Sequence, residues 1–228
     1  MYLFLLVLSI LSACTRSGFF EPEDSTSSYE SVTGNASDAD RSRWEQIYST
    51  AKYVYGKNPA EILIRAESFF PKKRKRALDL AMGEGRNAVF LAKKGFDVLG
   101  VDFSTVAIRK ALQLAREKGV RIQTQNADLR DYEIPEKHYD LIVNIDFLER
   151  SLIEQIKNGL KPKGILVFQT YNVDQLKNEK GPKIAKEYLL RLGELKQSFS
   201  EFEFLFYEES NDGVNSLSSL IARKPAIP

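Results

Sequence analysis

A short apolar strand that breaks on two glycines constrains the fold of this chain more than any other feature. It lies in the stretch 77–104, ALDLAMGEGRNAVFLAKKGFDVLGVDFS. Residues 77–81 form an apolar run typical of a buried parallel strand, and Gly83 and Gly85 make the chain turn directly after it. We therefore expect a strand followed by a tight glycine loop.

A helix and a second strand follow this loop. Residues 87–94 have helical composition before Gly95, and an apolar run at 97–101 ends on Asp102. In a strand–loop–helix–strand unit, loop glycines let the backbone approach a nucleotide, and an acid after the second strand reaches the ribose hydroxyls. The pattern predicts a nucleotide-containing cofactor across the carboxyl ends of the strands.

Two cofactor classes use such a unit, and Asp79 separates them in part. Residues 83–88, GEGRNA, fit the loose G-x-G-x-x-G/A fingerprint of dinucleotide-binding oxidoreductases, with Asp102 not quite twenty residues beyond it. A dehydrogenase strand has no need for a buried acid. Since an unpaired Asp inside a strand is costly, Asp79 requires a cationic or hydrogen-bonding partner.

The segment DLAMGEG at 79–85 resembles the first motif of class I S-adenosylmethionine-dependent methyltransferases, with Ala81 in place of a glycine. The resemblance implies that the methionine ammonium of S-adenosylmethionine pairs with Asp79 and that Asp102 binds the ribose. It also implies a reaction face at the carboxyl end of the strand at 139–146, formed by Asn144, Ile145 and Asp146. The further cofactor contacts that it implies are Ala81, Gly83 and Gly85 in the loop, Arg86 and Asn87 at the methionine carboxylate or an anionic substrate, Phe103, Asp128 and Leu129 around adenine, and Asn144.

Composition limits the chemistry open to this chain. Its 228 residues, 43% hydrophobic, suffice for one domain with a sizeable core, and a net charge of +2 gives no argument for a nucleic-acid partner. One Cys and one His exclude a disulfide framework and argue against a Cys/His metal site. We expect no metal and a non-catalytic His138, which precedes its strand.

The remaining periodicity predicts an α/β fold with a Rossmann-like, doubly wound sheet of seven strands, mostly parallel with a C-terminal antiparallel hairpin. The turn NDG at 211–213 favours that hairpin. Trp44, Tyr48 and Tyr55 are candidates to line the cofactor cleft. We expect helices at 44–51, 60–70, 150–160 and 187–195, another capped by Ser104 and ended by Gly119, a turn at 160–164, and strands at 120–125, 139–146, 165–170, 202–207 and 217–223.

Four passages resemble the tellurite-resistance methyltransferase family: YGKNP at 55–59, GEGRNAVFLA at 83–92, VDFS at 101–104, and YLLR with EL within 188–195. The resemblance implies methyl transfer to a small-molecule acceptor, for which a chalcogen compound is one candidate. A soft chalcogen nucleophile needs no general base, because the cofactor supplies the electrophile and the protein mainly aligns the reactants. We expect a monomer or a dimer.

The first residues predict export. Residues 1–13, MYLFLLVLSILSA, are apolar but shorter than the roughly 20 residues of a membrane-spanning helix, and are typical of a signal peptide. LSAC at 11–14 resembles a bacterial lipobox, which implies a lipidated Cys14 within a polar, disordered tether at 14–40. The methyltransferase domain, 41–228, would then be anchored to a membrane, whereas a misassigned start would leave it in the cytoplasm.

Two alternatives stay open at this point. An NAD(P)-dependent oxidoreductase would use the same glycine loop, although Asp79 and the C-terminal hairpin count against it. A lipid-anchored, non-catalytic nucleotide-binding module would remove a conflict, because S-adenosylmethionine is made in the cytoplasm and a lipoprotein domain faces away from it. The intact loop and Asp102 favour a methyltransferase.

Overall fold

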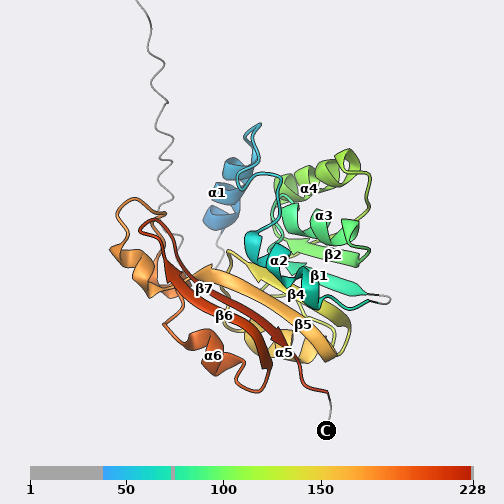
Figure 1. The fold of residues 1–228 in the computed structure, drawn as a ribbon. Helices are drawn as coiled ribbons and strands as arrows, with labels where there is room; N and C mark the ends of the chain where they lie inside the picture. The colour runs from blue at the N-terminus through green and yellow to red at the C-terminus, as the bar shows by residue number, and fades with distance from the viewer. Residues whose placement is uncertain (1–37, 73–74, 227–228) are drawn as a thin grey trace, which may run out of the picture.

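One mixed sheet of seven strands organises the molecule (Figure 1). The computed structural model describes residues 38–72 and 75–226. The expected signal peptide, Cys14 and nearly all of the expected tether lie outside the described residues. The strand order is β3-β2-β1-β4-β5-β7-β6, with β1 Arg76–Leu80, β2 Asp97–Asp102, β3 Gln123–Asn126, β4 Tyr139–Ile145, β5 Leu160–Tyr171, β6 Glu203–Asn211 and β7 Ser216–Arg223.

The sheet reverses its winding between β1 and β4. Strand β1 pairs in parallel with both neighbours, so that Leu80 lies opposite Val101 of β2 and Asn144 of β4. Strand β7 pairs antiparallel with both β5 and β6, which confirms the expected C-terminal hairpin. In doubly wound sheets a ligand binds at the carboxyl ends of the strands where the order reverses, and here that place is occupied by the glycine loop.

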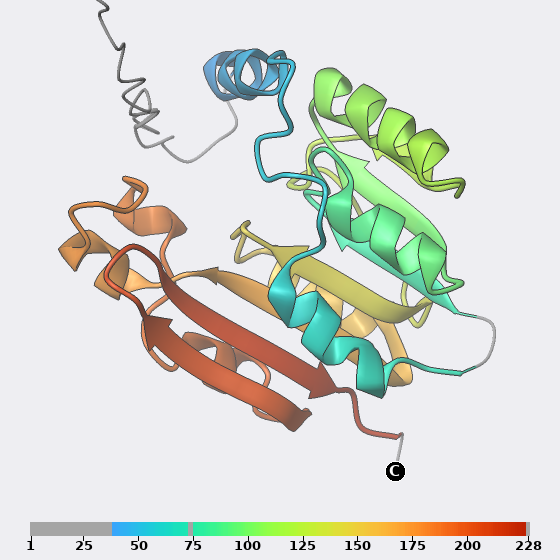
Figure 2. The same cartoon turned by 45° about the horizontal axis from the view of Figure 1, so that its top comes forward.

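Helices cover both faces of the sheet. Helices α2, α3 and α4 pack on one face, and α5 and α6 on the other (Figure 1). Helix α1 lies beside α4, as Figures 1 and 2 both show. No helix among the described residues is long and apolar enough to cross a bilayer. The bounds are α1 Asp38–Tyr48, α2 Glu61–Ala66, α3 Arg86–Lys93, α4 Thr105–Glu117, α5 Leu152–Gly159 and α6 Glu194–Ser198.

Local signals account for the helices around the glycine loop. The Ser104 hydroxyl accepts a hydrogen bond of 3.1 Å from the Ala107 N–H, so the expected N-cap of α4 is confirmed. Gly95 and Gly119 follow α3 and α4 with φ angles of 80° and 68°, the left-handed conformation that ends helices. The α3 and α4 elements therefore begin and end where their sequences indicate.

The prediction of a helix at 187–195 was wrong. The chain forms a short 3-10 helix, Lys186–Tyr188, and then an extended piece in which Leu190 bridges Asn172. Helix α6 begins only after Gly193, whose φ of 76° is left-handed. The apolar residues Leu189 and Leu190 are buried in the core, so tertiary packing rather than helical periodicity decided their conformation.

Several strand boundaries also differ from the expectation, and β6 runs to Asn211 rather than to residue 207. Strand β3 begins at Gln123 rather than at residue 120, because the Val120 N–H still bonds to the Ala115 carbonyl at the end of α4. The turn expected at 160–164 lies inside β5, as an irregular stretch with Lys163 at a φ of 64°. There the register with β4 shifts between Tyr139 and Leu141. The strand thus absorbs the turn as a bulge.

Candidate active site

The loop between β1 and α3 needs its glycines for two different reasons. Gly83 and Gly85 have φ angles of 53° and 81°, which non-glycine residues rarely adopt. A Cβ on Gly85 would lie 2.6 Å from the Ala111 Cβ, so this glycine lets α4 approach the loop. A Cβ on Gly83 would lie 3.1 Å from the Tyr48 hydroxyl, so this glycine lets the Tyr48 side chain of α1 pack closely over the loop. Ala81 also has a positive φ, 51°, the conformation that explains a glycine at this place in the resembling motif.

Asp102 holds the loop with both carboxylate oxygens. Its Oδ2 accepts a hydrogen bond from the Gly83 N–H at 2.8 Å, and its Oδ1 accepts one from the Ser104 N–H, also at 2.8 Å. Burial raises the Asp102 pKa to about 6 despite these donors. Each oxygen keeps a second lone pair, so the carboxylate can still accept hydrogen bonds from ribose hydroxyls.

Asp79 is a buried carboxylate that the described residues leave partly unsatisfied. It is 1% exposed, and its Oδ2 has no hydrogen-bond partner among those residues. Burial raises its pKa to about 7, against the opposing effects of the Ala88 N–H and the Arg86 charge. An orphaned acceptor of this kind fits the ammonium group of S-adenosylmethionine.

The expected adenine residues follow the ends of two neighbouring strands, Phe103 after β2 and Asp128 and Leu129 after β3. Asp102 pairs with Asn126, whose side-chain amide donates to the Phe103 carbonyl at 2.8 Å. The Arg41 guanidinium of α1 lies 5.4 Å from the centre of the Phe103 ring. Asp128, followed by the buried Leu129, accepts a hydrogen bond from Arg130 Nε at 2.9 Å, and this pairing lowers the Asp128 pKa.

The expected reaction face lies at the carboxyl end of β4. Asn144 is buried there with Ile145, and its side-chain amide donates to the Phe147 carbonyl at 2.7 Å. Asp146 follows with a φ of 59° and an ion pair of 2.9 Å between its Oδ2 and Arg86 Nη2. Burial raises the Asp146 pKa, and the Arg86 charge opposes this rise. Arg86 therefore joins the start of α3 to the end of β4.

Asn87 has a structural contact. Its side-chain oxygen accepts a hydrogen bond of 2.9 Å from the Ala60 N–H, immediately before α2. Arg86 likewise donates to the Tyr55 carbonyl at 3.2 Å and stacks on the Tyr55 ring. Their contact with a methionine carboxylate stays a prediction.

The α1 segment reaches the site through residues that the sequence did not single out. The Glu45 carboxylate accepts hydrogen bonds from the Ser104 hydroxyl and from the N–H groups of Thr105 and Val106, at 2.9, 2.7 and 3.1 Å. It thus caps α4 from another helix. Tyr48, one of the expected cleft residues, is 7% exposed, and burial with the nearby Asp102 carboxylate raises its pKa.

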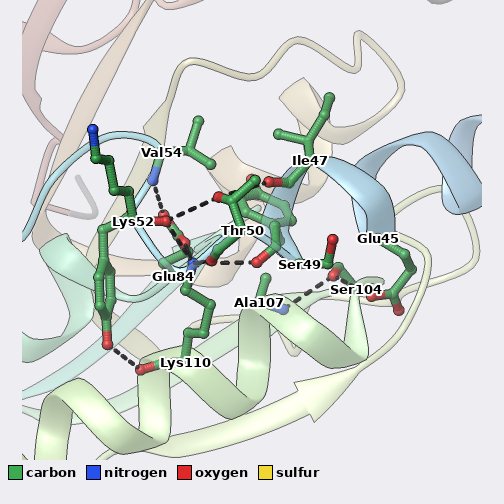
Figure 3. Close-up of polar contacts among 12 residues, drawn as sticks. Glu45, Ile47, Ser49, Thr50, Lys52, Val54, Glu84, Ser104, Ala107 and Lys110 are labelled. Atoms are coloured by element: carbon green, nitrogen blue, oxygen red, sulfur yellow. Dashed lines mark hydrogen bonds and ion pairs between the residues drawn. The ribbon is translucent and has the colours of Figure 1, made fainter.

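A buried ion pair holds the linker after α1 (Figure 3). Glu84 of the loop pairs with Lys110 of α4, and its other oxygen accepts the Val54 N–H at 2.6 Å. Lys110 Nζ also donates to the carbonyls of Tyr48, Thr50 and Lys52 at 3.2, 3.0 and 2.8 Å. An acid between two loop glycines carries no local signal for such contacts, because the partners are remote in sequence.

The described residues contain no group of three or more His, Cys, Asp or Glu side chains that could hold a metal ion. The polar groups of the site instead surround the glycine loop. The loop backbone, the unpartnered Asp79 oxygen and Asp102 lie around one place, and this arrangement fits the expected cofactor, which carries both an ammonium group and a ribose.

Comparisons with known proteins identify the kind of domain. Residues 77–164 match the methyltransferase domain family. The chain is 31% identical over 173 residues to the ubiquinone biosynthesis O-methyltransferase of Actinobacillus pleuropneumoniae, covering 70% of this chain and 71% of that protein. It is 27% identical over 164 residues to the enzyme of the same name from Alkalilimnicola ehrlichii, covering 68% and 65%.

Solved structures share the fold. TehB from Haemophilus influenzae superimposes with a TM-score of 0.59 at 22% identity, covering 81% of this chain and 66% of that one. Phosphoethanolamine N-methyltransferase 2 from Haemonchus contortus, solved in complex with S-adenosyl-L-methionine, gives a TM-score of 0.59 at 19% identity, covering 83% and 57%. These relatives decide between the two cofactor classes. The chain belongs to the class I S-adenosylmethionine-dependent methyltransferases, and S-adenosylmethionine is its cofactor.

Proposed function

We propose that this enzyme transfers a methyl group to a hydroxyl oxygen of a small molecule. The observation that carries the proposal is the group of polar side chains at the carboxyl end of β4. There the partly exposed pair of Arg86 and Asp146 lies next to Gln169 of β5, whose carbonyl accepts the Asp146 N–H at 2.9 Å. The Gln169 amide donates to the Ser219 hydroxyl at 2.7 Å. Such polar groups suit a hydroxylated acceptor, and the similar curated proteins are named O-methyltransferases.

The chain's own residues bind and orient. S-adenosylmethionine supplies an electrophilic methyl on a sulfonium. Asp79 would hold the ammonium, Asp102 the ribose, and the loop backbone at Gly83 the part between them. Tyr48 covers the loop from α1 and would exclude water from the reaction.

A chalcogen anion is the second candidate acceptor. Its support is the resemblance of YGKNP at 55–59, the loop segment and the later passages to the tellurite-resistance family. Such a soft nucleophile would need only alignment with the methyl group.

An acceptor screen with the full-length protein tests this choice. We would follow S-adenosylhomocysteine release with catechol, an alkyl thiol, selenide and tellurite. We expect turnover with the hydroxyl compound. Turnover with selenide or tellurite alone would replace the hydroxyl proposal by the chalcogen one.

We also propose that the protein is a lipoprotein anchored through Cys14. The support is the apolar stretch 1–13 followed by LSAC at 11–14. Labelling of cells with a palmitate analogue should mark the wild-type protein and not the Cys14→Ala variant. Equal labelling of both proteins, or an unlabelled wild-type protein in the cytoplasmic fraction, would contradict the proposed lipid anchor.

A further inference from the structure

The Asp146 carboxylate has an arrangement that a simple structural ion pair does not require. Its Oδ2 pairs with Arg86, whereas no hydrogen bond reaches its Oδ1 from the residues that the structure describes. The side chains of Asp146 and Arg86 are each 20% exposed. One oxygen is therefore held in place while the other is open to a ligand at the carboxyl end of β4.

The backbone at Asp146 is held in an unfavourable conformation. Its φ of 59° is left-handed, which costs a non-glycine residue about 1–2 kcal/mol. The Asp146 N–H bonds to the Gln169 carbonyl, and Asn144, two residues earlier, pairs with Leu80 at the end of β1. The surrounding strands thus aim this side chain toward the glycine loop, where Arg86 meets it.

We propose that Asp146 is the general base that takes the proton from the acceptor hydroxyl. The proposal rests on the proposed O-methyl transfer. As the acceptor oxygen bonds to the methyl carbon, the bond from that carbon to sulfur breaks and leaves its electron pair on sulfur. The hydroxyl proton passes to Asp146 Oδ1, so the products are a methyl ether, neutral S-adenosylhomocysteine and a protonated carboxyl.

The charges around Asp146 suit this role. Burial raises its pKa and makes it a stronger base than an exposed carboxylate, while Arg86 of α3 opposes the rise. Tyr48 of α1 also faces it, since the Asp146 charge contributes to the raised Tyr48 pKa. The Tyr55 ring stacks on the Arg86 guanidinium, so it positions Arg86 and not Asp146.

The test compares two acceptors that differ in acidity. Full-length wild-type protein and the Asp146→Asn variant are assayed with catechol and with nitrocatechol, whose hydroxyl is already ionised at mildly alkaline pH. We expect kcat with catechol to fall about 10²- to 10⁴-fold in the variant and kcat with nitrocatechol to change only a few-fold. The acid limb of the catechol pH profile should disappear with the carboxylate.

Three controls keep the result interpretable. Calorimetric titration should give the variant nearly wild-type affinity for S-adenosylmethionine. Asp131→Asn removes an exposed carboxylate outside the site and should leave kcat unchanged. Asp146→Gly removes the carboxylate but accepts a positive φ, so it serves if the Asn variant fails to fold.

The outcomes separate this inference from the proposed function. An equal loss with both acceptors, or no loss with either, would overturn the role of Asp146 and leave O-methylation standing. A wild-type protein that binds S-adenosylmethionine but methylates neither compound would instead overturn the hydroxyl acceptor, and the base with it.

Discussion

Asp79 and Asp102, the two acids proposed to bind the cofactor, are unfavourable in the cofactor-free fold because both are buried. Both carboxylates are buried, and burial raises their pKa values from 3.8 to about 7 and about 6. Neither meets a cationic side chain at hydrogen-bonding distance among the described residues. The site is thus electrostatically prepared for a positively charged ligand.

These two acids predict the pH dependence of stability. Between about pH 4 and 7 the folded state binds more protons than the unfolded state, because both folded pKa values lie above 3.8. The free energy of unfolding of the cofactor-free protein should therefore fall as pH rises through this window and level off above it. Urea unfolding at several pH values measures this, and a rise in stability across the window would contradict it.

The Asp79→Asn variant separates binding from stability. It removes a buried charge but keeps a side chain that can accept the Ala88 N–H, so we expect a flatter pH dependence and a higher Tm at pH 8. Affinity for S-adenosylmethionine should fall about 10- to 100-fold, since a hydrogen bond to a charged group contributes about 1.5–3 kcal/mol. An unchanged affinity, measured by calorimetry, would contradict a contact between Asp79 and the cofactor.

Alanine substitutions at Gly85 and Gly95 form a matched pair of variants, because the two glycines have nearly equal φ angles. Gly85→Ala adds a Cβ at 2.6 Å from that of Ala111, whereas Gly95→Ala, at a φ of 80°, meets nothing within 4 Å. We expect Gly95→Ala to cost about 1 kcal/mol from backbone strain and Gly85→Ala about 2–4 kcal/mol, because overpacking adds to the strain. Equal losses in chemical denaturation would show that α4 moves away freely.

At the scale of elements, α1 and its linker are attached to α4 and the glycine loop by side chains. Glu45 caps α4, and the Glu84–Lys110 pair holds the carbonyls of residues 48, 50 and 52 (Figure 3). Few apolar contacts support α1 in addition to these bonds, because Tyr48 is the one buried core residue among the described side chains of α1. The position of α1 over the loop therefore depends on charge pairing.

Lys110→Ala should destabilise the protein by about 3 kcal/mol, because it leaves the Glu84 carboxylate buried without its cation. Hydrogen exchange should also increase at residues 49–54, because the carbonyls of residues 48, 50 and 52 lose their donor. The double variant Glu84→Gln with Lys110→Met removes both charges and should recover part of the loss. A double variant no more stable than Lys110→Ala would show that packing, rather than the unpaired charge, is responsible.

At the scale of the whole molecule, S-adenosylmethionine should stabilise the fold, because it binds only the folded protein, in which the strands meet between β1 and β4. At a free concentration of 100 times Kd, binding adds about 2.7 kcal/mol to the free energy of unfolding. Asp102→Ala should lose most of this ligand-induced gain, because it removes the acceptor of the Gly83 N–H, which is also the acceptor proposed for the ribose. A gain of the same size from NADH would contradict the cofactor assignment.

Much of the fold could be predicted because its signals are local. The apolar strand before Gly83, the Ser104 cap of α4 and the hairpin turn at 211–213 each depend on neighbouring residues, and the structure confirms all three. Asp79 and Asp102 could be chosen as site candidates because their places follow from the strand–loop–helix–strand order. Propensity and periodicity therefore determined β1, α3, β2, α4 and the C-terminal hairpin.

Only the tertiary structure decided which distant groups meet. Glu45 reaches Thr105, and Arg86 reaches Asp146, across about 60 residues of chain. The segment 187–195 has a helical pattern, yet Leu190 pairs with Asn172 because burial of its side chain outweighs helix propensity. Local sequence thus determined the strands, helices and glycine loop, whereas long-range burial and charge pairing determined how α1 closes over them and where Asp146 points.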